Sequence, residues 1–301
     1  MTVSLRDRVP APVLFVVGGA SMYVGAALAV GLFDHLSPAA VAVLRILGAA
    51  LVLIGWRRPA APAWRGGRLA RAVAFGLATA CMNVAFYEAI DRLPLGTAVA
   101  IEFCGPVAVA AFASRRPRDV AAVVLAAVGV LLIADVRWSG SPAGVLWALA
   151  AAAMWAAYII LGKRVASAGN GVDTMAVGFA VAAAVLCPVL FAGGSGVWTA
   201  LAGPTVLPLA IGVGVLSSVV PYVLDQVVLR RVGQARFAVL LALLPVMATV
   251  IGLVALGQIP GPLEAVGIGA VITAVALRSR DGDTPVPLGR ASPDRRSDRG
   301  E

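Results

Sequence analysis

The sequence predicts an all-α integral membrane protein with ten transmembrane helices, arranged as two inverted five-helix repeats with both termini in the cytoplasm. Three observations lead to this prediction. The chain is 60% hydrophobic and only 13% charged, whereas soluble domains have about 25% charged residues. Its apolar runs each have about the length that crosses a bilayer. Its basic residues fall in alternate connections between these runs.

The apolar runs give the expected spans. A helix needs about 20 apolar residues to cross the hydrocarbon core. The first run is too long for the hydrophobic part of a signal peptide, so we interpret it as a helix of the mature protein. The runs lie at about 11–33, 38–56, 70–90, 94–113, 119–135, 141–162, 174–192, 205–229, 234–257 and 262–278.

Positive charge predicts the orientation of these spans, because cytoplasmic loops are enriched in Lys and Arg. The connections between them alternate between rich and poor in these residues, and outside the rich ones only Arg92, Arg137 and the intramembrane Arg45 are basic. The net charge of +9 therefore reflects topology and an anionic lipid surface, and we expect no nucleic-acid partner. The rich segments hold 21 of the 24 basic residues and are 1–10, 57–71, 114–119, 163–173, 230–236 and 278–301.

The two halves of the chain resemble each other at an offset of 139 residues. Pro106 corresponds to Pro245, and the break at 91–96 corresponds to the break at 230–235. With five helices in each half, the second copy enters the membrane from the opposite side, as in carriers whose site lies near the midplane. The predicted units are a first repeat at 11–135, a second repeat at 141–278 and a disordered cytoplasmic tail at 279–301.

Glu102 lies near the middle of the fourth expected span and is the strongest candidate for a functional side chain. A charge at the centre of a spanning helix costs about 2.5–3.5 kcal/mol on insertion scales. Pro106 has no amide hydrogen for the Glu102 carbonyl, which predicts a kink and a free acceptor beside the carboxylate. Because burial disfavours an ionised carboxylate, we expect Glu102 to carry a proton or to bind a substrate amine. The alternative is a structural acid held by a basic partner.

Arg45 is the obvious candidate for that partner, since it lies in the second span at a similar depth. If the two residues pair, both are structural, and the loss of one would cost about 3–5 kcal/mol. If Arg45 instead binds freed carbonyl groups elsewhere, Glu102 stays available. The sequence leaves both possibilities open. Position 102 corresponds to Leu241 in the second half, so the carboxylate is not duplicated.

Further polar and aromatic residues are candidates for a pathway between the halves. Asn83 and Tyr87 are four residues apart and share a helix face, and the offset maps them to Tyr222 and Gln226. Hydrogen bonding between helices is the alternative role for this set. The other candidates are Trp155, Tyr158 and Tyr23 in the cavity, Glu88 and Asp225 as gates or simple surface charges, and Gly105 with Pro106 and Pro245 as positions of close packing and flexure.

Several segments resemble a known family. VLRILGAALVL at 43–53 and the two five-helix units resemble the EamA-type drug/metabolite transporter superfamily. PLGTAVAIEFCGPVAVAAFASRRP at 94–117 resembles the fourth helix of its bacterial threonine/homoserine exporters, and MNVAFYEAI at 82–90 and SSVVPYVLDQVVLRRV at 217–232 are similar to the same group. The resemblance, which covers about residues 11–278, implies a ten-helix carrier of the bacterial inner membrane. It also implies proton-driven export of small neutral amino acids or related metabolites.

Two other hypotheses about the function stay open. One is a carrier for another small solute, such as a cationic drug or a sugar. The other is a non-transporting membrane protein or an intramembrane enzyme, which the sequence disfavours because it has no phosphate-binding loop, metal-ligand cluster or catalytic triad. We therefore expect no enzyme activity, cofactor or metal. The expected partners are a small-molecule substrate, protons and the lipid bilayer, and the sequence does not give the oligomeric state.

Overall fold

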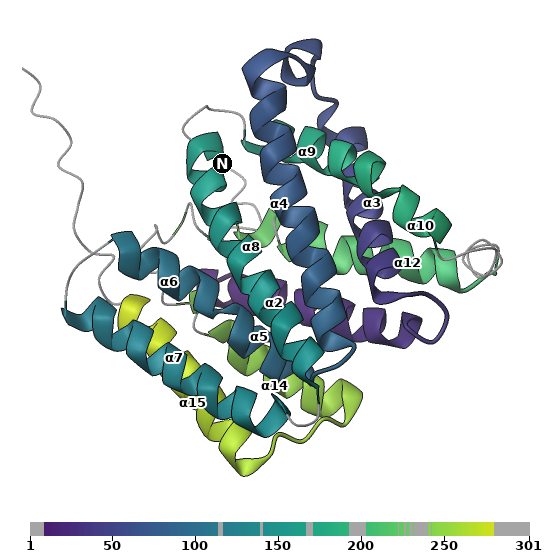
Figure 1. The fold of residues 1–301 in the computed structure, drawn as a ribbon. Helices are drawn as coiled ribbons and strands as arrows, with labels where there is room; N and C mark the ends of the chain where they lie inside the picture. The colour runs from purple at the N-terminus through teal and green to yellow at the C-terminus, as the bar shows by residue number, and fades with distance from the viewer. Residues whose placement is uncertain are drawn as a thin grey trace, which may run out of the picture.

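The computed structural model describes residues 9–113, 117–138, 141–166, 171–192, 203–221, 223–225, 227–228, 231, 240–241 and 243–279. All regular secondary structure within these ranges is helical, as Figure 1 shows. The prediction of an all-α chain is therefore confirmed for the part of the protein that the structure describes. The expected tail after residue 279 lies outside the described residues.

The helices occur in the following order along the described part of the chain. The first half contains α2 (Ala11–Leu32), α3 (Pro38–Arg57), the 3-10 turn η1 (Ala61–Trp64), α4 (Gly66–Ile90), α5 (Leu95–Glu102), α6 (Cys104–Ala113) and α7 (Pro117–Trp138). The second half contains α8 (Pro142–Ala166), α9 (Gly171–Leu186), α10 (Pro188–Ala192), α12 (Val206–Gly214), the π-helical turn η2 (Val215–Val219), α14 (Leu243–Leu256) and α15 (Pro262–Ser279).

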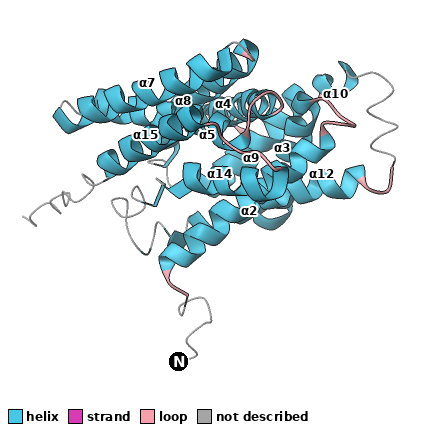
Figure 2. Ribbon diagram, turned by 90° about the horizontal axis from the view of Figure 1, so that it is seen from below, coloured by secondary structure: helices cyan, strands magenta, loops and turns pink. Residues whose placement is uncertain are grey.

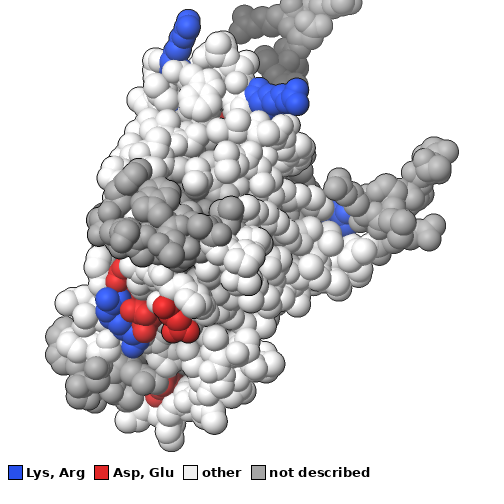
Figure 3. All heavy atoms as spheres, turned by 90° about the vertical axis from the view of Figure 1, so that its right-hand side faces the viewer, with Lys and Arg blue, Asp and Glu red and all other residues white. Residues whose placement is uncertain are grey.

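Many of these helices have the length and composition of membrane spans. Within the described ranges, six segments are long and apolar enough to cross a bilayer, at Ala11–Leu32, Pro38–Arg57, Gly66–Ile90, Pro142–Leu161, Asp173–Leu190 and Pro208–Asp225. Shorter apolar helices occupy Leu95–Val109, Val120–Leu132, Leu243–Leu256 and Pro262–Leu277. Large apolar side chains such as Leu51, Leu131 and Val254 are exposed on the outside of the bundle, and most of the face in Figure 3 carries neither basic nor acidic residues. A surface of this kind suits contact with lipid tails.

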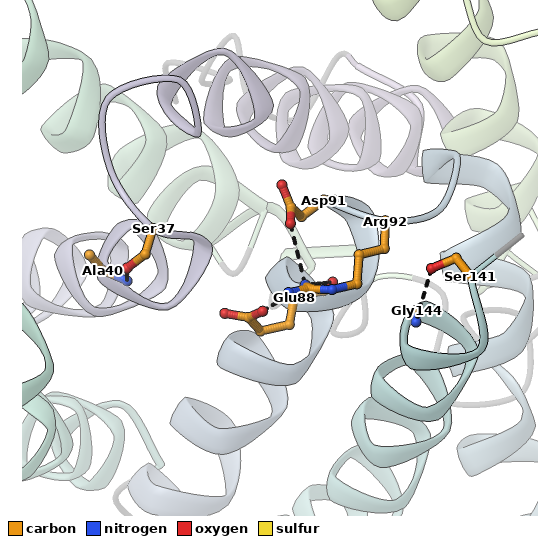
Figure 4. Close-up of polar contacts among 7 residues, drawn as sticks. All are labelled: Ser37, Ala40, Glu88, Asp91, Arg92, Ser141 and Gly144. Carbon is orange, nitrogen blue, oxygen red and sulfur yellow. Dashed lines mark hydrogen bonds and ion pairs between the residues drawn. The ribbon is translucent and has the colours of Figure 1, made fainter. Parts of the chain in front are cut away.

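Local sequence explains where several helices start and stop. Pro38 occupies the first turn of α3, where an amide hydrogen would have no acceptor within the helix, so proline is tolerated there. The Ser37 hydroxyl caps the same end by accepting a hydrogen bond from the amide of Ala40. Ser141 caps α8 in the same way at Gly144. Both caps are drawn in Figure 4. Arg58 ends α3 in the left-handed conformation, with a φ of 45°.

Proline also divides helices within the bundle. The fourth expected span is split into α5 and α6 at Phe103, three residues before Pro106, at the place where the sequence predicts a kink. The seventh span is split at Cys187, directly before Pro188. In each case the proline cannot donate to the carbonyl four residues earlier, so a regular helix cannot continue unchanged through the position.

Helices from the two halves pack against each other. Helices α7 and α15 lie side by side at one flank and α3 and α9 at the other, as Figures 1 and 2 show. Helix α4 packs against α8 and α9, α12 against α2 and α3, and α14 against α2 and α5. Glycine permits the closest of these contacts. A Cβ at Gly76 of α4 would overlap the backbone of Gly178 in α9, and one at Gly129 of α7 would lie 2.7 Å from the Gly267 carbonyl of α15.

Candidate functional site

A cavity of about 450 Å³ lies among helices of both halves of the chain. This volume is within the range of small-molecule binding sites. Its walls are mostly apolar and aromatic, with a few polar and charged groups. The residues from α2 to α6 are Gly19, Met22, Tyr23, Ala26, Arg45, Leu53, Thr79, Met82, Asn83, Phe86, Glu102, Phe103 and Pro106. Those from α8 onward are Trp155, Tyr158, Ile159, Met175, Phe179, Ser217, Ser218, Val219, Pro221, Asp225, Leu241, Leu244 and Val275.

The cavity brings together most of the side chains that the sequence singles out. Five of the expected substrate or proton residues line it, together with the expected ion-pair partner, one expected flexure point and one candidate gate. These are Glu102, Asn83, Tyr23, Trp155 and Tyr158, then Arg45, Pro106 and Asp225. Tyr222 and Gln226, the expected counterparts of Asn83 and Tyr87, lie outside the described residues.

Arg45 is held by the turn η2 of the second half. Its Nε donates to the Ser218 hydroxyl at 3.0 Å, and its Nη2 donates to the Ser217 carbonyl at 2.7 Å. Its guanidinium carbon lies 5.5 Å from the centre of the Tyr87 ring, a distance that allows a cation–π contact. Arg45 therefore fixes α3 to η2, and the arrangement matches the possibility that it binds carbonyl groups rather than a carboxylate.

The Ser217 carbonyl is available to Arg45 for a reason that can be read from the sequence. Residue 221 is a proline, so it has no amide hydrogen to donate to the carbonyl four residues earlier. The chain also passes through a π-helical turn here, which removes regular α-helical hydrogen bonds. The same spacing joins Glu102 to Pro106 and Leu241 to Pro245. Three helices that line the cavity thus each place a carbonyl without its usual donor at this level of the bundle.

Glu102 lies at the end of α5, where the helix breaks, and its side chain faces the cavity. The residue is only 8% exposed. Among the described residues, neither the ion pairs nor the hydrogen bonds include its carboxylate, so Arg45 and Glu102 line the same cavity without forming an ion pair. The two side chains therefore face one internal space without a direct ion pair between them.

Asn83 and Tyr87 contribute in different ways. Asn83 donates through its side-chain amide to the Thr79 carbonyl at 2.8 Å, and Thr79 donates to the Phe75 carbonyl at 2.8 Å. The side-chain oxygen of Asn83 is then left as an acceptor at the cavity wall. Tyr87 is fully buried and supports Arg45 with its ring, so it lies behind the cavity wall rather than on it.

Aromatic side chains shape the remaining wall. The Trp155 ring packs edge-on against Phe103 with the ring centres 4.7 Å apart. Tyr158 packs against Phe75 at 4.8 Å. Phe103 is the residue at which α5 and α6 separate, so this contact ties the break in the helix to α8. The aromatic residues give this part of the cavity the mostly apolar lining that is usual for small-molecule sites.

The two candidate gate residues have different surroundings. Glu88 lies at the end of α4 and forms an ion pair with Arg92 at 2.6 Å, and Asp91 approaches the same Arg92 nitrogen at 3.3 Å, as Figure 4 shows. The structure therefore places Glu88 in a surface charge cluster and not in the cavity. Asp225 does line the cavity, and none of the ion pairs of the described residues includes it.

Gly105 and Pro245 lie at helix contacts. A Cβ at Gly105 would overlap the Ala152 carbonyl of α8, so this glycine permits the close approach of α6 and α8. Pro245 is buried in α14, and its carbonyl accepts from the Thr249 hydroxyl at 2.9 Å. Both residues support the walls of the cavity through packing.

Sequence reasoning missed Ser217, Ser218 and Pro221 as site residues. The signal was present, because Pro221 follows Ser217 by the same four residues that separate Pro106 from Glu102. What the sequence could not show is that η2 lies against α3, so that Arg45 meets this freed carbonyl. Ser217 also donates to the Met22 carbonyl at 3.3 Å, which brings α2 into the same cluster.

Comparison with known proteins agrees with this arrangement. Residues 142–280 match the EamA-like transporter family. The chain is 35% identical over 266 residues to the threonine/homoserine exporter RhtA of Escherichia coli K12, covering 87% of this chain and 88% of the relative. It is 36% identical over 257 residues to RhtA of Salmonella typhimurium LT2, covering 84% and 86%.

The fold is also similar to that of a protein of known crystal structure. The TM-score is 0.51 at 18% identity, and the match covers 90% of this chain and 98% of that chain. The helical bundle, the apolar outer surface and the identity with the exporters over most of the chain agree with one another. The chain is therefore a multi-pass membrane protein that belongs to the EamA-like transporter family and resembles the threonine/homoserine exporters.

Proposed function

We propose that this protein is a secondary carrier of the bacterial inner membrane that exports small neutral amino acids or related metabolites in exchange for protons. The observation that carries the proposal is the cavity of about 450 Å³ between the two halves, which holds Glu102 without an ionic partner among the described residues. The relatives are named as threonine/homoserine exporters, which supports the same substrate class.

In this mechanism Glu102 binds either a proton or the ammonium group of the substrate, and the two compete. A carboxylate in a low-dielectric cavity is costly when it is ionised and unpaired. Protonation removes this cost, and so does the binding of an ammonium group. Because each ligand displaces the other, release of substrate on one side and uptake of a proton from that side become coupled steps.

Alternating access requires two halves that move relative to each other around the site. The helix contacts support a pseudo-two-fold arrangement of this kind. When the two halves are compared span by span, α2, α3 and α4 correspond to α8, α9 and α12, and α5 and α7 correspond to α14 and α15. Under this correspondence, the packing of α4 on α8 matches that of α12 on α2, and the packing of α4 on α9 matches that of α12 on α3. The pairs α3 with α9, α5 with α14, and α7 with α15 map onto themselves. We propose ten spans in two inverted repeats, at 11–135 and 141–278.

Contacts between connections support the proposed orientation. Arg57, the last residue of α3, forms an ion pair at 3.0 Å with Asp173 in the first turn of α9, and both positions are expected on the cytoplasmic side. Arg231 donates to the Val9 carbonyl at 2.9 Å, which joins two further segments expected on that side. At the other end, Gln258 accepts from the Leu95 amide at 2.8 Å, which joins two connections expected outside. None of these contacts crosses between the two sides.

Transport by the purified protein tests the proposal. In proteoliposomes loaded with unlabelled L-threonine or L-homoserine, we expect counterflow of the labelled amino acid, with no effect from preloaded sugars or cationic drugs. A thermal-shift series with amino acids, amines and sugars should show stabilisation by the amino acids. Counterflow with a sugar or a cationic drug, but with no amino acid, would favour a carrier for another solute. Absence of counterflow for every solute would contradict the proposal.

A further inference from the structure

We propose that Arg45 and Glu102 form a binding site for a zwitterion. The guanidinium binds the α-carboxylate of an amino acid, and the carboxylate binds its α-ammonium group. The inference rests on the proposed function and adds to it the residues that bind each charged group of the amino acid. Both residues face the same cavity, and no direct ion pair joins them among the described residues, which is the observation from which the inference starts.

Arg45 has the properties of a carboxylate receptor. It is only 9% exposed, and the ion pairs of the described residues do not include it. A buried cation without an anion carries a large desolvation cost. A guanidinium has five N–H donors, and the bonds from Arg45 to Ser217 and Ser218 use its Nε and one N–H of Nη2. The donors that remain are arranged as a planar fork, which suits the two oxygens of a carboxylate.

The receptor is held in position before a substrate arrives. Ser217 and Ser218 fix the guanidinium on one side, and the Tyr87 ring supports its face. Ser21 donates to the Leu216 carbonyl at 2.8 Å, which anchors the same turn to α2. A charged group that is already ordered loses less conformational entropy on binding, and this favours affinity and selectivity.

Glu102 is the second charged group of the proposed site and lies on a different helix from Arg45. It lies on α5 at the break before Phe103 and next to a carbonyl that Pro106 leaves without its usual donor. An ammonium group has three donors, so it can be shared between the carboxylate and other acceptors that line the same cavity, such as the Asn83 side-chain oxygen. The apolar and aromatic walls, including Phe103 and Trp155, then face the substrate side chain.

This arrangement predicts selectivity for molecules that have both groups. An amino acid neutralises both buried charges at once. An amine without a carboxylate leaves Arg45 unpaired, and a hydroxy acid without an amine leaves Glu102 unpaired. A binding site that leaves a buried charge unpaired strongly rejects the incomplete ligand. We therefore expect single-charge analogues to bind at least about tenfold more weakly than the amino acid.

Competition against labelled L-threonine in wild-type counterflow tests this without a mutation. The probes are unlabelled L-threonine, L-threoninol, which lacks the carboxylate, and 2,3-dihydroxybutanoate, which lacks the amine. The expected result is strong competition by threonine alone. Equal competition by threonine and threoninol, with threonine counterflow intact, would overturn the zwitterion site and leave the proposed function standing. Failure of wild-type counterflow with every amino acid would instead contradict the proposed function.

Substitutions then assign each group. In a thermal-shift titration we expect Arg45→Gln to weaken the binding of threonine by at least about tenfold while the weak response to threoninol stays unchanged. Glu102→Gln should leave the response to 2,3-dihydroxybutanoate unchanged. Arg57→Gln, an arginine in the exposed ion pair with Asp173, is the matched control and should bind threonine as the wild type does. If Arg45→Gln does not fold, Arg45→Lys, which keeps the positive charge, takes its place in the titration. The competition experiment with the wild-type protein then tests the zwitterion site without any substitution. Tight threonine binding by a folded Arg45→Gln would contradict the inference.

Discussion

At the scale of single residues, Arg45 and Glu102 lie at one cavity, and each has different neighbours. Arg45 is bonded to Ser217 and Ser218 of the other half, while Glu102 faces the cavity at the end of α5. This division leaves the carboxylate available to protons and substrate. It also makes the hydroxyl of Ser218 a positioning group, since it orients the guanidinium without itself being charged.

Replacing Ser218 with alanine should weaken the orientation of Arg45. The substitution removes one hydrogen bond to a charged group, so we expect a loss of about 1.5–3 kcal/mol, seen as weaker threonine binding, reduced stability or both. Thermal unfolding in detergent, measured with and without threonine, separates these effects. Thr273→Ala is the control, because its hydroxyl bonds the Gly269 carbonyl on an exposed face of α15. Unchanged binding and unchanged stability in Ser218→Ala would contradict this role.

At the scale of helices, breaks at proline supply polar groups to an otherwise apolar bundle. Pro106 divides α5 from α6 beside Glu102, and Pro221 follows the turn whose carbonyl binds Arg45. In a membrane a free carbonyl must find a donor in protein or water. The breaks therefore lie where the cavity provides such a partner, and glycines at the contacts between helices provide the close packing around it.

Replacing Pro221 with alanine should restore a donor to the Ser217 carbonyl. The new amide competes with Arg45 for this acceptor, so we expect lower threonine affinity and slower counterflow without loss of folding. Transport rate and substrate affinity in proteoliposomes are the measurements. Pro208→Ala in the first turn of α12 is the matched control, because a residue there has no intrahelical acceptor to serve. Wild-type affinity and rate in Pro221→Ala would show that the freed carbonyl is not needed.

Replacing Gly76 with alanine should separate α4 from α9. A Cβ there would overlap the backbone of Gly178, and such overpacking costs about 1–3 kcal/mol. The same change at Gly269 of α15, where no atom lies within 4 Å of an added Cβ, should be neutral or stabilising because alanine favours the helix. Thermal unfolding of the two variants in the same detergent compares them directly. Equal stability of both would contradict the close packing of α4 and α9.

At the scale of the whole molecule, the cavity lies between two halves, and the helix contacts of one half match those of the other when the two halves are exchanged. The contacts near the helix ends fall into two groups. Arg57 with Asp173 and Arg231 with Val9 join positions expected in the cytoplasm, and Leu95 with Gln258 joins positions expected outside. The outer surface exposes many large apolar side chains, and few charged residues interrupt the face in Figure 3. These features belong to the scaffold, whereas the carboxylate at position 102 has Leu241 as its counterpart and is not duplicated.

Cysteine labelling in cells tests this orientation. A cysteine at the exposed Ala61 in η1 should react with a membrane-impermeant maleimide only after the cells are opened. A cysteine at the exposed Asp34, between α2 and α3, should react in intact cells. The unsubstituted protein, with Cys81, Cys104 and Cys187, measures the background. The reverse pattern, or labelling of both positions from one side, would contradict the proposed topology.

Much of this account follows from the sequence, because apolar runs, proline positions and charge bias are local properties. They predict the helical class, the kink beside Pro106 and the candidates that meet at the cavity, including Glu102 and Asn83. The choice between pairing and separation of Arg45 and Glu102 could not be predicted. It depends on which helix faces α3 at the depth of Arg45, and this is set by packing between the halves. The attachment of Arg45 to Ser217 and Ser218 is a result of that packing.

The most direct test of the central claim is efflux of preloaded threonine from proteoliposomes when the outside is made acidic. The account predicts that the proton gradient accelerates efflux by the wild type. It also predicts that Glu102→Gln, which cannot be ionised, loses this acceleration. Asp173→Asn, which removes a carboxylate from the exposed ion pair with Arg57, should respond to the gradient as the wild type does. Efflux by Glu102→Gln that is still accelerated by the gradient to the wild-type extent would contradict the claim.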